Sequence, residues 1–344
     1  MDYIETASRL ADEVLFPAAL ATDAADAVPM ELLDALADAG LYGAGVAADF
    51  GTVCAVQEAL AGGCLTTGFV WAQHLGLVHS LAAGGTPELR SRWLEPLARG
   101  GVRAGLALGG ALPRPALHAR RADGGWLLDG VSPFVSGWGL IDVVHTAARA
   151  GDEVLWLIVD AAEGPALRVE RLALMALNAT ATVHATFDAL LVPDDRVTGR
   201  HPAGGETPPE VLRLHASLAL GVASRCCRLL GPSALDQELA TLRTELDELG
   251  PGTAAARAAA GELAVRAAAA LMTATGSRSL LLGDHAQRLA REALFALVYA
   301  LRPGSRDALL STLGAGQDDE PPVLGRERLP ARPEEVDVHE ARRP

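Results

Sequence analysis

Apolar residues recur at helical spacing through the first hundred positions of the chain. Alanine and leucine return every three or four residues, a period typical of helices that bury one face. Gly40 and Gly43 interrupt the pattern, because glycine weakens a helix interior. We therefore expect an N-terminal helical domain over residues 1–103, with helices at Tyr3–Leu20, Met30–Ala39, Val53–Gly62 and Gly68–Ala83.

The periodicity changes after Gly101. Turn signals at Asp123-Gly124-Gly125 and Asp129-Gly130 separate short runs of β-forming residues. Five or more short strands with tight turns favour an antiparallel sheet or a small barrel. We therefore expect a middle β domain over residues 104–200, with strands at Trp126–Leu128, Val131–Ser136, Asp142–Arg149, Val154–Asp160 and Thr182–Leu191.

Helical spacing returns after residue 208. Long periodic segments with short connections are typical of an antiparallel four-helix bundle. The segment 316–344 is proline-rich and charged, so it buries too little surface to offset ordering and is predicted to be a disordered tail. The bundle is expected over residues 208–315, with helices at Pro209–Leu230, Ala234–Leu249, Thr253–Thr275 and Asp284–Leu301 and a short helix at Pro303–Leu313.

The stretch Asp284–Arg302 has an uneven distribution of polarity. Its charges gather near the start, where Arg288 and Glu292 lie one helical turn apart and can pair. No charge occurs between Ala293 and Leu301. Since a helix that is apolar all round is buried on every side, we expect this helix to run from a polar start into the middle of the bundle.

Composition narrows the class of function. The net charge of −14 disfavours nucleic acid and an anionic membrane surface as partners. The chain contains no lysine, which excludes Schiff-base chemistry through that residue. Its four cysteines lack the spacing of a metal site or a disulfide framework, so we expect buried thiols and no metal. No signal peptide or membrane-length apolar run is evident, and a cytoplasmic location is expected.

Several segments, taken in order, resemble the acyl-CoA dehydrogenase family. Gln287–Ala293 followed by Tyr299 is similar to the family's late R-L-x-R-D-A … Y-E-G-T helix. Gly125–Gly137 resembles the strand pair that leads to the family's flavin contact, and Val192-Pro193 resembles the exit from its β domain. The resemblance covers roughly residues 10–315 and implies an α+β fold with an N-terminal helical domain, an antiparallel β domain and a C-terminal four-helix bundle.

The resemblance implies an FAD site. Ser136 would hydrogen-bond the N5 or O4 edge of the flavin beside Gly137, and Phe134 would cover the ring. Arg243 would meet the pyrophosphate, and Arg288 or Arg291 would lie near a phosphate. The same residues are also compatible with an ordinary strand end and a solvated helix start. The following residues are the predicted cofactor contacts: Phe134, Ser136, Gly137, Arg243, Arg288 and Arg291.

A second flavin segment of the family, T-E-P-x-x-G-S-D, is missing. The corresponding stretch Ala107–Pro115 has no Thr, Ser, Glu or Asp. It leaves only the backbone N–H groups of Gly109 and Gly110, and the cation of Arg114, as possible contacts. We expect any flavin to be held differently here.

The family's catalytic glutamate is also missing. Ala300 stands where many members carry it, and Leu212 stands at the position that serves other members. A substitute base would come from His285, His215 or Glu292. The fold also hosts flavin-dependent monooxygenases that need no such glutamate, and His285 with Arg288 and Arg291 would suit that chemistry.

Three hypotheses therefore remain open. The first is an FAD-binding oxidoreductase of CH–CH donors with a diverged site and His285 as the candidate catalytic residue. The second is a flavin-dependent monooxygenase, and the third is a flavin-free homologue that serves as a structural partner. The resemblance implies a small-molecule or acyl-thioester substrate and a homodimer or homotetramer. The apolar helix Ala254–Thr275 beside Ala293–Leu301 supports assembly through the bundle.

Overall fold

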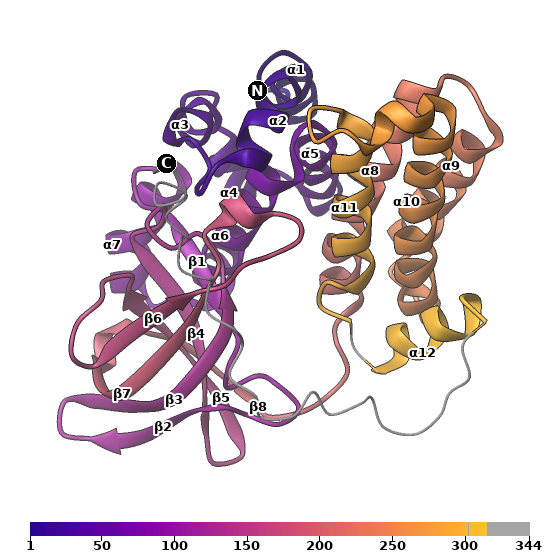
Figure 1. Cartoon of the computed structure of the whole chain (residues 1–344). Coiled ribbons are helices and arrows are strands. Elements are labelled where there is room, and N and C mark those ends of the chain that lie inside the picture. The colour runs from indigo at the N-terminus through magenta and orange to yellow at the C-terminus, as the bar shows by residue number, and fades with distance from the viewer. Residues whose placement is uncertain (302, 315–344) are drawn as a thin grey trace, which may run out of the picture.

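The chain folds into helices, then a sheet, then helices again, as the patterns predicted. The computed structural model describes residues 1–301 and 303–314, and the predicted tail lies outside these residues. Figure 1 shows the first helices at the top, the sheet below them and the last helices at the right. The fold is thus α+β, and within the described residues no helix is long and apolar enough to cross a membrane.

The N-terminal helices begin at side-chain caps. The carboxylates of Asp2 and Asp49 accept the backbone N–H groups of Glu5 and Thr52, and these bonds satisfy donors that a helix start leaves unpaired. Helix α6 is buried almost all round, because it contacts strand β1 on one side and helix α8 on another. The elements are α1 (Tyr3–Leu10), η1 (Ala11–Leu15), α2 (Phe16–Ala24), α3 (Met30–Asp38), η2 (Leu41–Gly43), α4 (Ala44–Ala47), α5 (Phe50–Gly63), α6 (Leu65–Gly84) and α7 (Pro87–Ala98).

The sheet has eight strands in the order β6-β7-β3-β2-β4-β5-β8, and β1 pairs with β4. Two predicted strands merge into β3, whose register against β7 shifts twice. The pairing is antiparallel except that β1, and one residue pair of β2, run parallel to β4. The strands are β1 (Ala104–Ala107), β2 (Leu117–Ala122), β3 (Gly125–Val135), β4 (Val143–Ala150), β5 (Glu153–Asp160), β6 (Leu167–Arg171), β7 (Val183–Pro193) and β8 (Val197–Pro202).

The C-terminal helices share a core with the N-terminal ones. Leu65 and Phe69 of α6 pack into the same apolar cluster as residues of α8, α10 and α11. Helix α9 begins with a capping box between Ser233 and Asp236. All four cysteines are buried and free. The elements are α8 (Pro209–Leu230), α9 (Ala234–Asp247), α10 (Thr253–Thr275), η5 (Gly276–Leu280), α11 (His285–Val298) and α12 (Pro303–Thr312), with η3 (Asn178–Thr180) and η4 (Asp194–Arg196) in the β region.

The burial of α11 differs from what its sequence predicted in both halves of the helix. The helix ends at Val298, and in its apolar half Leu294 is 41% and Val298 60% exposed. In its polar half, Arg288 is 0% and Glu292 2% exposed. The expectation of an apolar end buried on every side is therefore wrong. α8 and α10 cover one side of the helix, and its ion pair lies on the inward face.

Candidate functional site

The end of strand β3 carries the residues predicted to contact a flavin. Phe134 is 58% exposed, whereas Ser136 is buried. Ser136 Oγ lies 2.7 Å from Thr182 Oγ1, which lies 2.7 Å from Thr180 Oγ1. Because Thr180 donates its hydrogen to the carbonyl of Leu177, the chain of hydroxyls runs in one direction and Ser136 donates to Thr182. Ser136 therefore faces any ligand as an acceptor.

The backbone around this hydroxyl chain is strained. Phe134, Leu177 and Ala181 have φ values of 56°, 57° and 52°, in the left-handed region that side chains other than glycine rarely adopt. Each such residue costs on the order of 1–3 kcal/mol and persists only when its surroundings impose it, often at ligand sites. The junction of β3 with η3 is therefore a candidate ligand-binding surface.

The glycines near this surface have no free backbone donors. Gly109 donates its N–H to Ser132 Oγ at 3.1 Å, and Gly110 donates to the carbonyl of Ala147 at 2.9 Å. Gly137 donates to the carbonyl of Thr180 at 2.6 Å. The expectation that Gly109 and Gly110 still offer N–H groups to a flavin is thus wrong, because both groups already donate to acceptors in the sheet.

The start of α11 is a buried ionic cluster. Arg288 Nη1 donates to Glu292 Oε1 at 2.6 Å, and the imidazole of His285 stacks on the ring of Phe16 at 4.1 Å. Burial, with the cations of Arg288 and Arg225, lowers the pKa of His285 to about 4, so its imidazole is neutral at pH 7. Burial raises the pKa of Glu292, and Arg288 offsets this only in part. The interpretation of this segment as a solvated helix start is wrong.

Arg291 is also occupied by a carboxylate. Its guanidinium pairs with Asp23 at 2.5 Å and donates to Gln287 and to the carbonyl of Met175. It thereby ties α11 to α2 and to the loop before η3. Neither Arg288 nor Arg291 presents an unpaired cation, so a phosphate would have to displace a carboxylate from either one.

The end of α11 meets α6 and α8. Tyr299 makes edge contacts with Phe69 and His215 at ring distances of 5.0 and 5.2 Å, and its hydroxyl lies 3.4 Å from Gln73 Nε2. The next residue, Ala300, has a φ of 51°. Ala300 is the position that the sequence resemblance assigns to the family's glutamate. Among the described residues, the titratable groups in these ring contacts are the imidazole of His215 and the phenol of Tyr299.

A buried arginine fixes where α11 ends. Arg257 of α10 is 1% exposed, and its Nη2 donates to the carbonyls of Ala296 and Tyr299 at 2.9 and 2.8 Å. It therefore caps the negative end of the helix. Burial lowers the pKa of Arg257 to about 10, which still leaves it charged at pH 7.

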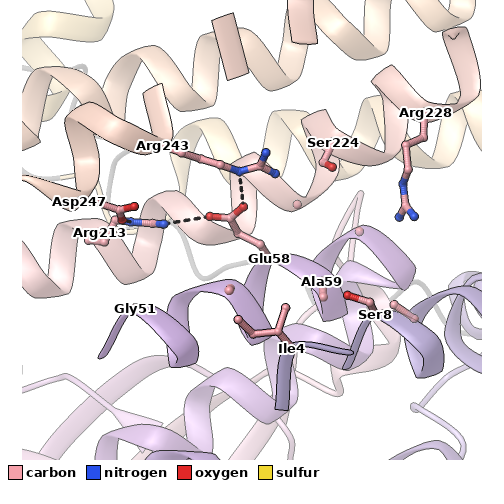
Figure 2. A pocket seen from close by; sticks show the side chains of 14 residues that line it. Ile4, Ser8, Gly51, Glu58, Ala59, Arg213, Ser224, Arg228, Arg243 and Asp247 are labelled. Atoms are coloured by element: carbon pink, nitrogen blue, oxygen red, sulfur yellow. Dashed lines mark hydrogen bonds and ion pairs between the residues drawn. The ribbon is translucent and has the colours of Figure 1, made fainter. Parts of the chain in front are cut away.

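Arg243 lies in a separate pocket between α5 and α8–α9 (Figure 2). Its Nε donates to Glu58 Oε2 at 2.8 Å, while Arg213 Nη2 donates to Glu58 Oε1 at 3.0 Å. The pocket is lined by none of Phe134, Ser136 or Gly137. The contact of Arg243 with a flavin pyrophosphate stays a prediction.

The sequence patterns did not identify Glu58, Arg213 and Arg257 as ionic partners. Glu58 is the one charged residue of α5, and since buried charges are rare unless they are paired, its position indicated a partner. Helices α8 and α10 carry further charged residues, so nothing in the sequence distinguished Arg213 or Arg257 from them.

Comparison with known proteins agrees with this architecture. Residues 2–101 match the model of the acyl-CoA dehydrogenase N-terminal domain. Over 239 residues, or 64% of this chain, the sequence is 28% identical to benzylmalonyl-CoA dehydrogenase of Aromatoleum aromaticum. The match covers 63% of the length of that curated relative.

Solved structures show the same fold. A glutaryl-CoA dehydrogenase from Mycobacterium smegmatis in complex with FADH2 superposes with a TM-score of 0.74 at 19% identity, covering 90% of this chain and 92% of that one. Butyryl-CoA dehydrogenase from Megasphaera elsdenii gives 0.73 at 18% identity, covering 91% and 96%. A dibenzothiophene monooxygenase from Paenibacillus sp. A11-2 gives 0.72 at 16% identity, covering 91% and 97%.

The order of helices, sheet and helices defines an acyl-CoA dehydrogenase fold. In sequence, the chain is similar to the acyl-CoA dehydrogenase family through its N-terminal domain and through the curated relative.

Proposed function

We propose that the chain is an FAD-dependent oxidoreductase of CH–CH donors with a diverged active site. The single observation that carries the proposal is the end of α11. There Tyr299 contacts aromatic and polar side chains of α6 and α8, next to Ala300, the position that the resemblance assigns to the family's base. An acyl thioester or another small molecule is the proposed substrate.

The proposed flavin contacts are Phe134, Ser136 and Gly137. The exposed aromatic ring of Phe134 suits the face of an isoalloxazine, and Ser136 suits its N–H edge as an acceptor. FAD, when bound, supplies a two-electron acceptor for a hydride. The chain's own part is to cover the ring and to position it against the end of α11.

The proposed acid–base residue is His215. A general base must lie within reach of the proton that it removes. His285 is fourteen residues upstream of Tyr299, about 21 Å along a helix, and Glu292 is buried against Arg288. His215 contacts Tyr299 directly. Of the three substitutes that the sequence offered, only His215 thus lies at the proposed site.

One observation favours a second candidate function, that of a flavin-free structural partner. All three arginines predicted to meet FAD phosphates are paired with carboxylates of the same chain: Arg243 with Glu58, Arg288 with Glu292, and Arg291 with Asp23. The backbone donors of Gly109 and Gly110 are used as well. In a homologue that no longer binds FAD, such internal ion pairs would neutralise the arginines and stabilise the fold.

An absorbance spectrum of the purified protein, before and after reconstitution with FAD, tests the proposal. A flavoprotein shows flavin bands that survive gel filtration, together with substrate-dependent bleaching. A protein that stays colourless after reconstitution is the flavin-free partner. A bound flavin that consumes oxygen with a reductant and hydroxylates a small molecule would instead indicate the monooxygenase.

A further inference from the structure

The end of helix α11 is an unusual stop for a helix. Helices commonly end at a glycine in the left-handed conformation. Here the helix ends at Val298, Tyr299 is extended (φ −60°, ψ 128°), and Ala300 takes the left-handed turn with a φ of 51°. An alanine disfavours this conformation, because its Cβ crowds the following carbonyl oxygen. Another group must therefore impose the turn.

Arg257 of α10 holds this turn from outside the helix. Its Nη2 donates to the carbonyl of Ala296, inside the last helical turn, and to the carbonyl of Tyr299, beyond it. The last carbonyls of a helix lack helical partners and are open to such a donor. Because one nitrogen binds both carbonyls, it draws the Tyr299 peptide back toward the helix end, and the chain turns at Ala300.

Burying this arginine is energetically unfavourable. Arg257 is 1% exposed, its hydrogen bonds among the described residues go to main-chain carbonyls, and its Nη1 has no partner there. Buried charges are normally paired with an opposite charge. A buried cation held only by carbonyls is thus a costly way to end a helix, and features of this kind are expected at functional sites.

A glycine provides the room for the guanidinium. Gly261 lies one turn along α10 from Arg257. A Cβ on Gly261 would lie 3.2 Å from Arg257 Nη1 and 3.3 Å from the Cα of Leu297 on α11. The guanidinium therefore occupies the space between the two helices that a side chain at position 261 would fill.

The turn determines what Tyr299 contacts. Its ring packs edge-on against Phe69 at 5.0 Å and against the imidazole of His215 at 5.2 Å. The charge of Arg257 also attracts the phenol of Tyr299. Because Arg257 fixes the peptide of Tyr299, the side chain leaves the helix end toward α6 and α8.

We propose that Arg257 is a positioning residue, which directs Tyr299 toward His215 by ending α11 and turning the chain at Ala300. Its relevance to catalysis rests on the proposed function, in which His215 is the base. The placement of Tyr299 does not depend on that function, so the two are tested separately.

Fluorine NMR of the full chain labelled with fluorotyrosine tests the placement. The chain has 3 tyrosines, and Tyr→Phe variants assign their signals. We expect Arg257→Met to shift the Tyr299 signal and to leave the other two in place, whereas Arg257→Lys, which keeps a cationic donor, should retain the wild-type signal. Arg266→Met, at an exposed arginine of the same helix, is the matched control. An unchanged Tyr299 signal in Arg257→Met would overturn the inference.

A second substitution shows whether the shift reports the contact with His215. His215→Gln should move the Tyr299 signal in the wild type. It should move the signal less in Arg257→Met, because the two rings are no longer held together there. Equal shifts in the two backgrounds would show that Arg257 does not bring Tyr299 to His215.

Unfolding in urea tests the turn itself. Ala300→Gly should raise the urea midpoint of the wild type, because glycine adopts the left-handed conformation without strain. It should raise the midpoint less in Arg257→Met, where Ala300 can relax. Such non-additivity is expected only of residues that act on each other. An equal gain in both backgrounds would mean that another part of the chain holds the turn.

Gly261→Ala keeps the inference testable if Arg257→Met does not fold. It retains the arginine but places a methyl group against Nη1, so it should also shift the Tyr299 signal. A wild-type signal in folded Gly261→Ala would count against the inference. None of these measurements needs flavin or turnover. If they succeed while His215→Gln leaves turnover unchanged, the proposed role of His215 fails and the positioning by Arg257 stands.

Discussion

The neighbouring threonines determine the direction of the hydrogen bond that Ser136 makes. Its hydroxyl donates to Thr182, so only its lone pairs remain for a ligand. The sequence resemblance suggested a hydrogen bond to the N5 or O4 edge of the flavin without giving its direction. The direction of the hydroxyl chain makes it an acceptor, a property that only the neighbouring threonines of the fold determine.

Replacing this hydroxyl should weaken flavin retention. Ser136→Ala is expected to cost about 0.5–1.5 kcal/mol of binding, the worth of one hydrogen bond. Phe134→Ala should add to the loss, because the ring covers the flavin face. Flavin content after gel filtration measures both. The exposed Ser311→Ala of α12 is the control, and full retention in the Ser136→Ala/Phe134→Ala double variant would refute the placement.

His145 makes stability depend on pH. It is buried in β4, and its Nε2 lies 2.9 Å from Thr198 Oγ1, which itself donates to the carbonyl of Trp156. Nε2 therefore holds the proton, and Nδ1 has no hydrogen-bond partner among the described residues. Burial lowers the pKa of His145 from 6.5 to about 3, because a second proton would be buried without an acceptor.

The sign of this effect follows from proton binding. The unfolded chain protonates His145 below pH 6.5 and the folded chain does not, so the free energy of unfolding falls as pH drops from 6.5 toward 3. At pH 5 the contribution is about 2 kcal/mol at most. His145→Gln should flatten the difference between urea midpoints at pH 7.5 and pH 5, whereas the exposed His118→Gln should not. An unchanged difference in His145→Gln would contradict the assignment.

At the scale of elements, the crossing of α5 and α8 depends on the absence of a side chain. A Cβ on Gly221 would lie 2.4 Å from the backbone oxygen of Glu58. Gly221→Ala should therefore force the helices apart and lower the free energy of unfolding by about 1–3 kcal/mol. Gly252→Ala, at the start of α10, meets nothing within 4 Å and is the matched control. Equal urea midpoints for the two variants would show that the crossing can relax.

The end of α11 determines whether dehydrogenation is possible. Ala300 offers no carboxylate, so proton removal is left to the proposed base His215 and the wild type should turn over acyl-CoAs slowly; a general base typically contributes about 10²–10⁴-fold. Changing residues 300–302 to Glu-Gly-Thr tests whether the missing glutamate limits turnover, because it restores the family's sequence at all three positions. Ala300→Glu alone retains Leu301 and Arg302 where the family has Gly-Thr. Turnover is measured with acyl-CoAs of several lengths and an artificial electron acceptor.

Robust turnover by the unmodified protein would show that a base exists elsewhere. His215→Gln then distinguishes the candidates, because it should abolish such turnover and shift its pH profile, whereas His285→Gln should leave both unchanged.

For the whole molecule, the surface available for assembly differs from the predicted one. Most of the surface of α10 is covered by helices of the same chain, namely α8, α9, α11 and α12. Among the described residues of this region, a group of exposed apolar side chains lies instead on α11 and at the end of η5, namely Leu280, Leu281, Leu282, Leu294 and Val298.

We expect these side chains to be covered by a second copy. Light scattering at micromolar concentration should report a multiple of the 35.6 kDa chain mass, and Leu294→Glu with Val298→Glu should yield the monomer. Leu191→Glu, on the exposed edge of β7, is the control and should leave the oligomer intact. A monomeric wild type would refute the expectation.

The sequence by itself determined the helical segments and most of the sheet. Pro209–Leu230 and Thr253–Thr275 were predicted to the residue, because a local period, a proline start and a glycine end are all written in consecutive residues. Strands β1, β2, β6 and β8 were not predicted. β2 carries two arginines and β1 has four residues, so neither shows the alternation that identifies a strand.

Only the tertiary structure decided which polar groups are buried and what they bind. Arg288 and Glu292 lie inward and Leu294 and Val298 outward, because α8 and α10 cover one side of α11. Glu58 and Arg213 are 155 residues apart and meet at the crossing of α5 and α8. Periodicity reports which residues share a face of a helix, but the direction of that face depends on partners from distant parts of the chain. The pairing of the arginines with carboxylates is determined by those partners.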